Sequence, residues 1–167
     1  MLGELGKLLT KRSSSRDSPI FLISDEAYCR IVFEGTFAPS PIGYYDYSLL
    51  VYTFGKSTLA PGERLGYIAL SPHMKLEDRE QMREAVTRAC MTGNTHFKIF
   101  QHYTQTSPSF LGYSRPSSTT SHALECMDDI LIDIGQMEAR RDKLFLGLSK
   151  QGYEISKPQG SFYMMVR

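Results

Sequence analysis

The sequence predicts an α/β fold in which a mixed sheet is flanked by helices. Short apolar segments rich in β-branched and aromatic residues occur at 20–23, 49–54 and 65–70, which is typical of buried strands. Segments with helical spacing of apolar residues lie on either side of them, at 2–9 and 75–91. The chain has 167 residues, 41% of them hydrophobic, and is therefore long enough to bury one core.

The composition argues against several classes of function. The formal net charge is +1 and no basic stripe is present, so we expect neither nucleic acid nor a membrane as a partner. The three cysteines are widely spaced, which favours reduced thiols and a cytoplasmic location. The four histidines form no HExxH motif, so we expect no metal site. No apolar run approaches the ~20 residues that span a bilayer.

The chain begins with an amphipathic helix over residues 2–9, a polar loop at 11–19 and a strand at 20–23. Helix, loop and strand form half of a βαβ unit whose first strand is missing, so we expect the sequence to start inside a larger domain. A short strand is predicted at 29–33 and a surface loop at 35–47. The loop contains three tyrosines that we expect to pack within it: Tyr44, Tyr45 and Tyr47.

The stretch after the second strand contains a lysine, Lys56, whose positive charge would be costly to bury. Lys56 follows strand 49–54, and a cation at the end of such a strand is unfavourable unless something uses it. Thr53 and Arg64 stand three residues before and eight after it, so a hydroxyl and a guanidinium can converge near the amine. This combination suits an anionic group held beside a reactive lysine.

The strand directions follow from the lengths of the connections. The segment at 65–70 is separated from 49–54 only by a short turn, so we expect the two to be antiparallel. We expect 20–24 and 49–54 to be parallel neighbours, with their carboxyl ends at the same edge of the sheet.

The second half of the chain is predicted to be mainly helical. A helix over 75–91 precedes a second one that ends near Thr106, and a loop follows at 107–121. A long helix is predicted from Ser121 to near Gly152, with an apolar stripe that we expect to lie in the core. The chain closes with a strand that begins at Gly160.

One interpretation of Lys56 is nucleotide binding, because it lies in the sequence Gly-Lys-Ser-Thr. A phosphate-cradling loop needs another glycine five residues before Gly55, but Leu50 stands there, inside a predicted strand. No helix is predicted directly after Lys56 either. Both features argue against this interpretation.

The other interpretation is Schiff-base chemistry with an aldehyde cofactor. Arg64 and the hydroxyls of Thr53 and Ser57 could hold its phosphate. Asp25 could pair with its ring nitrogen, because Asp25 ends one strand just as Lys56 follows the next. Parallel strands place both residues at the carboxyl edge, where open α/β sheets bind ligands.

Tyr28 lies three residues after Asp25 and could reach the same cofactor as a phenol donor. The motifs Ile-Ser-Asp-Glu-Ala-Tyr28, Thr-Phe-Gly-Lys-Ser57 and Pro-Gly-Glu-Arg-Leu-Gly-Tyr67 together resemble the large domain of class I/II aminotransferases. These are pyridoxal-phosphate enzymes of the aspartate aminotransferase fold. The resemblance extends over nearly the whole chain and implies a partial three-layer α/β/α large domain of a PLP-dependent transferase.

The resemblance implies a role for each matching residue. Lys56 would be the catalytic residue, binding the cofactor aldehyde as a Schiff base and moving a proton at the substrate Cα. Asp25 would keep the pyridine nitrogen protonated, and Tyr28 would donate to the phenolate oxygen. Three residues would contact the phosphate: Arg64, Thr53 and Ser57.

It also implies how the chain is divided and what the enzyme does. Residues 1–120 would be the C-terminal part of the PLP-binding large domain, 121–152 a connecting helix and 153–167 the first strand of a small domain. The parent enzyme, expected to be a homodimer, would transfer an amino group from an amino acid to a 2-oxo acid. The chain alone is expected to be a poor catalyst. Alternatives are a PLP-dependent lyase or decarboxylase on the same scaffold, and a non-catalytic interaction module.

Overall fold

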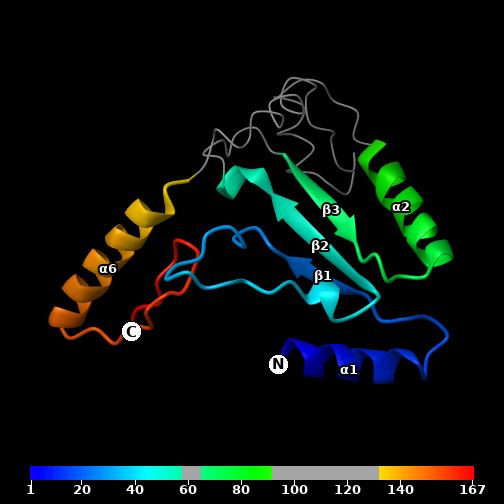
Figure 1. Ribbon diagram of the computed structural model, residues 1–167, viewed down its shortest axis with the longest axis horizontal. Coiled ribbons are helices and arrows are strands. Elements are labelled where there is room, and N and C mark those ends of the chain that lie inside the picture. The colour runs from blue at the N-terminus through cyan, green and yellow to red at the C-terminus, as the bar shows by residue number, and fades with distance from the viewer. Residues whose placement is uncertain (58–64, 92–131) are drawn as a thin grey trace.

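The computed structural model describes residues 1–57, 65–91 and 132–167, and the structural statements below refer to these parts of the chain. At its centre is a three-stranded sheet in the order β1-β2-β3 (Figure 1). The strands are β1 (Leu22–Asp25), β2 (Ser48–Thr53) and β3 (Gly66–Leu70).

The strand directions agree with the prediction. β1 and β2 are parallel, with Leu22 opposite Ser48 and Asp25 opposite Val51. β2 and β3 are antiparallel, with Leu49 opposite Leu70. β1 and β2 are therefore joined by a crossover, and their carboxyl ends lie at one edge of the sheet.

The described parts of the chain contain three α-helices. α1 (Leu2–Ser13) confirms the predicted amphipathic helix, and α2 (Leu76–Met91) confirms the one after the third strand. α6 (Ile134–Lys150) lies at the opposite end of the molecule from α2, with the C-terminal segment next to it (Figure 1). Two short 3₁₀ helices interrupt the loops, η1 (Pro41–Gly43) and η2 (Phe54–Lys56).

The tyrosines of the loop before β2 attach the helices to the sheet. The Tyr45 hydroxyl donates to the carbonyl oxygen of Ile20 at 2.6 Å and lies 2.7 Å from Ser13 Oγ at the end of α1. The Tyr47 hydroxyl donates to Asp78 in the first turn of α2 at 2.8 Å. The predicted packing within the loop is met only in part: the ring centroids of Tyr45 and Tyr47 lie 6.3 Å apart, but both hydroxyls bond outside the loop, and Tyr44 is exposed.

The predicted long helix is interrupted: its start at Ser121 lies outside the described residues, but residues 132 and 133 are not helical. α6 begins at Ile134, because Asp133 has an extended backbone and its carboxylate accepts the amide hydrogen of Gln136 at 2.8 Å. Such an N-cap begins a new helix rather than continuing one. Its predicted apolar stripe is not wholly core either, since Leu144 is 53% exposed. The predicted segments between 92 and 131 lie outside the described residues.

The strands predicted at 29–33 and from Gly160 onward are also absent from the described structure. Val32 and Gly160 form an isolated antiparallel bridge instead. Ser161 has a φ of 67°, in the left-handed region, so the extended backbone cannot run straight on from Gly160. The segment turns here and places the following side chains against the loop after β1.

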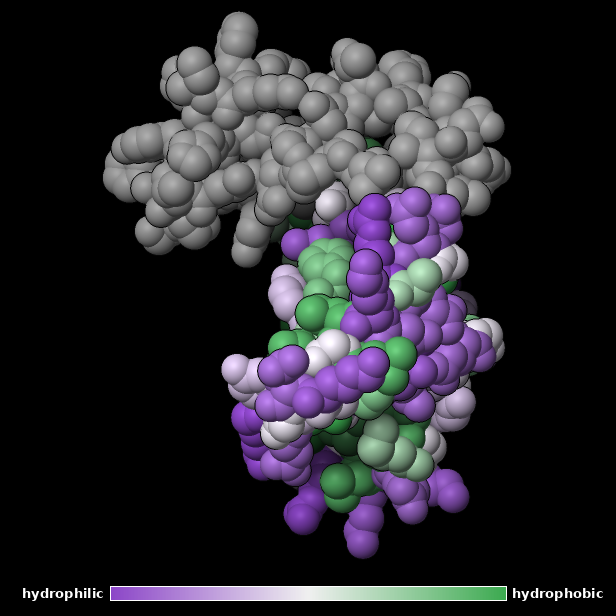
Figure 2. Space-filling view, turned by 90° about the vertical axis from the view of Figure 1, so that its left-hand side faces the viewer, coloured by the Kyte–Doolittle hydropathy of each residue, from purple (hydrophilic) through white to green (hydrophobic). Residues whose placement is uncertain are grey.

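The buried hydrophobic side chains of the described residues gather around β2 and the loop after β1: Ala27, Ile31, Phe33, Tyr45, Leu49, Tyr52, Leu65 and Met74. Other apolar groups remain open to solvent on the face formed by α6 and the C-terminal segment, where Figure 2 shows hydrophobic patches between hydrophilic ones. No helix in the described part of the chain has the length and apolar character needed to cross a membrane.

Candidate active site

The candidate site lies at the carboxyl edge that β1 and β2 share. β1 ends at Asp25, and β2 ends at Thr53 just before η2, which carries Lys56. Because Asp25 pairs with Val51, Thr53 lies two residues further along on the same face of the sheet. The fold thus brings the ends of the two predicted motifs together.

Asp25 and Tyr28 line a cleft of about 490 Å³ beside this edge. The Asp25 carboxylate is exposed and accepts a hydrogen bond from the amide of Ala27 at 3.2 Å. Residues 36–39, Pro41 and the bridge region at 159–161 also line the cleft. The cleft is within the roughly 300–1,000 Å³ that is usual for small-molecule sites.

The ammonium of Lys56 lies over two aromatic rings. Its Nζ atom is 5.8 Å from the ring centroid of Tyr28 and 5.8 Å from that of Phe162. Both distances fall within the range in which a ring face attracts a cation. The two rings touch each other edge to face, with centroids 5.2 Å apart. Lys56 and Tyr28, both predicted site residues, are therefore neighbours.

The Tyr28 hydroxyl donates to the hydroxyl of Tyr163 at 3.2 Å. This hydrogen bond, with partial burial and the nearby charge of Asp25, raises the pKa of Tyr28 above its ordinary value. The phenol therefore keeps its proton at neutral pH and is available as a donor.

The two predicted phosphate-binding hydroxyls are occupied within the chain. Thr53 Oγ1 accepts the amide hydrogen of Gly55 at 3.2 Å and donates to the carbonyl of Leu65 at 3.3 Å, so it caps η2 and positions Lys56. Ser57 is buried, with its hydroxyl 2.5 Å from that of Tyr52. Their contact with a phosphate stays a prediction, and Arg64 lies outside the described residues.

The nucleotide-binding interpretation does not fit this geometry. Leu50 lies within β2, and Lys56 ends a single 3₁₀ turn that follows the strand directly. A backbone loop that wraps phosphates therefore has no room before the lysine.

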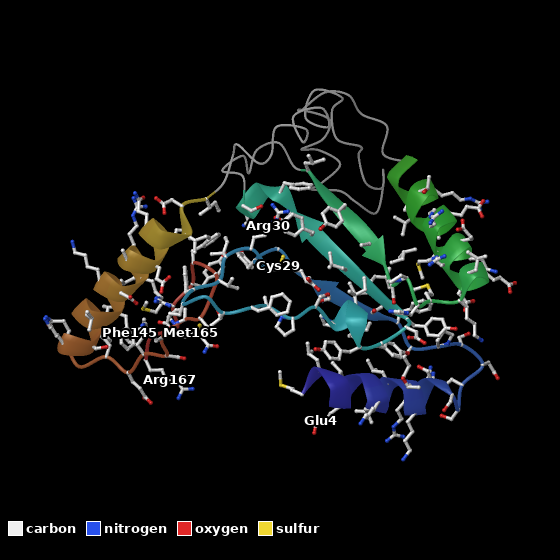
Figure 3. All side chains as sticks on the ribbon, viewed as in Figure 1. Glu4, Cys29, Arg30, Phe145, Met165 and Arg167 are labelled. Carbon is white, nitrogen blue, oxygen red and sulfur yellow. The ribbon has the colours of Figure 1, made fainter. Side chains whose placement is uncertain are left out.

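Sequence reasoning missed Phe162 and Tyr163 as neighbours of the lysine. Both belong to the Gly-Ser-Phe-Tyr sequence, which was predicted as a strand, and Tyr163 is 135 positions from the tyrosine that it contacts. Arg30 was missed as well. It lies on the loop after β1 toward the end of β2, where Figure 3 labels it, and its guanidinium is 5.7 Å from the ring centroid of Tyr52.

Comparisons with known proteins identify the family. The sequence profile of aminotransferase class I and II matches residues 7–167, so the chain belongs to this family. A probable aspartate aminotransferase of Methanocaldococcus jannaschii is 25% identical over 150 residues, which are 90% of this chain and 35% of that protein.

Solved structures share the fold. An aminotransferase from Eubacterium rectale is 30% identical, with a TM-score of 0.74 over 99% of this chain and 37% of its own. A PLP-bound C-S lyase from Staphylococcus hominis is similar in fold, with 17% identity and a TM-score of 0.56 over 99% of this chain and 36% of its own. The predicted fold class is confirmed. The chain spans little more than a third of the length of these proteins.

Proposed function

We propose that this chain provides the lysine-bearing part of an enzyme that transfers an amino group from an amino acid to a 2-oxo acid, with pyridoxal phosphate as cofactor. The observation that supports this most directly is the grouping of an amine, a phenol and a carboxylate at one sheet edge. Lys56 lies 5.8 Å from the Tyr28 ring, and Tyr28 and Asp25 line the same cleft. Family membership supports the same reaction type.

The donor set suits the cofactor. An exposed carboxylate at Asp25 can pair with a protonated ring nitrogen, and the protonated phenol of Tyr28 can donate to a ring oxygen. Lys56 offers the amine that an aldehyde requires. We assign the phosphate contacts to Arg64, Thr53 and Ser57, on the strength of the family motif.

When bound, pyridoxal phosphate supplies an electron-withdrawing ring that stabilises negative charge at the substrate Cα. The residues of this chain would bind and orient the cofactor and move the proton. Asp25 would hold a proton at the ring nitrogen, and Tyr28 would orient the ring through its hydroxyl. Lys56 would take a proton from the substrate Cα as a general base and would then give that proton to C4′ of the cofactor as an acid.

Covalent labelling tests the assignment of Lys56. The purified chain is incubated with pyridoxal phosphate, reduced with borohydride and mapped by mass spectrometry. We expect the label mainly on Lys56, and we expect Lys56→Ala to lose it. Lys75→Ala is the matched control, because Lys75 is an exposed lysine just before α2, and it should leave the label unchanged. Labelling spread evenly over exposed lysines would contradict the assignment.

The reaction type has its own test. Incubation of the labelling-competent chain with an amino acid should convert the added pyridoxal phosphate into pyridoxamine phosphate and release the matching 2-oxo acid. A single turnover is enough to detect both products. Elimination or carbon dioxide release without pyridoxamine phosphate would favour the lyase or decarboxylase instead. Labelling without either product would mean that this chain alone binds the cofactor but does not complete the reaction.

A further inference from the structure

The C-terminal segment reaches the candidate site through a short, specific backbone pairing. The amide of Phe33 donates to the carbonyl of Gln159 at 2.9 Å, and the amide of Ser161 donates to the carbonyl of Ile31 at 2.7 Å. Between these two hydrogen bonds, Gly160 faces Val32 so closely that a Cβ atom on it would lie 2.6 Å from the Ile31 carbonyl oxygen. Only a glycine allows this approach.

The turn at Ser161 then directs two aromatic side chains onto Tyr28. The ring centroids of Phe162 and Tyr163 lie 5.2 and 5.7 Å from that of Tyr28, and both pairs are nearly perpendicular. Such edge-to-face contacts restrict how a ring can tilt. Tyr163 adds the hydrogen bond from Tyr28, with 3.2 Å between the two hydroxyl oxygens.

We propose that Tyr163 is a positioning residue that sets the orientation of the Tyr28 hydroxyl beside Lys56 in the candidate site. This inference rests on the proposed function, because it concerns how Tyr28 meets the cofactor. A hydroxyl can donate one hydrogen bond and accept others. Tyr163 accepts a hydrogen bond from Tyr28 in this structure. When Tyr28 donates its hydrogen bond to a ligand instead, Tyr163 can donate one to the Tyr28 oxygen. The Tyr28 oxygen therefore has a fixed partner in both situations.

The charged and titratable groups around the Tyr28 side chain come from three elements. Asp25 at the end of β1 and Tyr163 of the C-terminal segment both raise the pKa of Tyr28. Lys56 of η2 lies over its ring at 5.8 Å. The hydrogen bond with Tyr163 is the largest of the influences that raise the pKa. Removal of the Tyr163 hydroxyl should therefore move the pKa of Tyr28 downward.

The test uses Tyr163→Phe, which removes one oxygen and keeps the ring contacts. The 167-residue protein is labelled with ¹³C at the tyrosine ζ carbons and titrated by NMR without cofactor. The signal missing from Tyr28→Phe identifies Tyr28 among the ten tyrosines. We expect a lower Tyr28 pKa in Tyr163→Phe. We also expect roughly 3-fold weaker binding of pyridoxal phosphate, in line with one exposed hydrogen bond.

Tyr153→Phe is the matched control, because Tyr153 is an exposed tyrosine of the same segment, and it should change neither quantity. An unchanged Tyr28 pKa in a folded Tyr163→Phe protein would overturn the inference and leave the assignment of Lys56 intact. Failure of borohydride labelling at Lys56 would overturn the proposed function, whatever the titration shows. Circular dichroism establishes that each variant is folded.

Discussion

At the scale of single residues, Tyr47 connects the loop before β2 to α2 through one hydrogen bond. Its hydroxyl donates to the Asp78 carboxylate at 2.8 Å. A hydrogen bond to a charged acceptor contributes more than a neutral one, although partial exposure reduces it. We expect Tyr47→Phe to lower the free energy of unfolding by about 1 kcal/mol, measured by urea denaturation at neutral pH.

The pH dependence of this effect has a definite sign. The hydrogen bond to Asp78 raises the pKa of Tyr47, because it favours the protonated phenol. The stabilisation is therefore fully present below the ordinary tyrosine pKa of about 10 and is lost as the pH rises through the higher folded value. The difference between wild type and Tyr47→Phe should shrink in that alkaline range. Tyr44→Phe, an exposed site, should show no difference at any pH.

The placement of Asp25, Tyr28 and Lys56 near one sheet edge was predictable from the sequence, because short local motifs contain them; their roles stay predictions. Asp25 and Tyr28 lie within one turn after a strand, and Lys56 follows directly after another, so strand direction alone brings them to one edge. Tyr163 was not predictable, because its partner is 135 positions away and Ser161 must first adopt a left-handed backbone. Local patterns do not report such a turn.

At the scale of elements, two glycines should respond oppositely to the same substitution. Gly147 lies inside α6 with open space around it, so Gly147→Ala should raise the free energy of unfolding by about 0.5–1 kcal/mol through helix propensity. Gly160 lies against the Ile31 carbonyl, so Gly160→Ala should lower it by about 1–3 kcal/mol. Denaturant unfolding measures both, and equal effects of the two would contradict the close approach at Gly160.

Gly160→Ala should also disturb the candidate site, since Gly160 anchors the segment that carries Phe162 and Tyr163.

The sequence-based prediction of elements failed where a local turn or cap interrupts an apolar pattern. Apolar spacing predicted one long helix and one strand, but the cap at Asp133 and the turn at Ser161 interrupt them. Periodicity reports which residues are apolar, whereas these interruptions depend on a single side-chain hydrogen bond and a single backbone angle.

At the scale of the whole molecule, a charged cluster attaches α6 and the C-terminal segment to the loop after β1. Its centre is Arg141, whose side chain is only 4% exposed and whose guanidinium lies 4.6 Å from the Phe33 ring centroid. Arg141 donates to the carbonyl of Pro158 at 2.9 Å and to three carboxylates: Glu34, Glu138 and Asp142. The sequence predicted that α6 packs through its apolar residues. In the structure the buried Arg141 makes much of the contact between α6 and the loop after β1.

Lys157 also belongs to this cluster, and its ion pairs make the stability of the cluster depend on pH. Its ammonium lies 2.7 Å from Glu34 and 3.3 Å from Asp142. The hydrogen bond from Lys157 lowers the pKa of Glu34. Burial acts to raise the pKa of Asp142, but the hydrogen bonds and charges of Lys157 and Arg141 outweigh it, so this pKa is lowered too. Hydrogen bonds to both carboxylates raise the pKa of Lys157.

These directions predict how the contact responds to acid and alkali. A lowered carboxylate pKa gives stability that is present above the ordinary value of about 4 and is lost as the pH falls through the folded value. A raised lysine pKa gives stability that is present below about 10.4 and is lost as the pH rises through the folded value. Lys157→Met should therefore destabilise the protein most at neutral pH and least at both extremes.

Urea denaturation of wild type and Lys157→Met between acid and alkaline pH measures this profile. Lys143→Met serves as the control, because Lys143 is an exposed lysine of α6. Added salt should reduce the difference at neutral pH, since Lys157, Glu34 and Asp142 are each more than 40% exposed and mobile ions screen such pairs. A difference between Lys157→Met and wild type that stays constant from acid to neutral pH would show that the two carboxylates do not hold the segment in place.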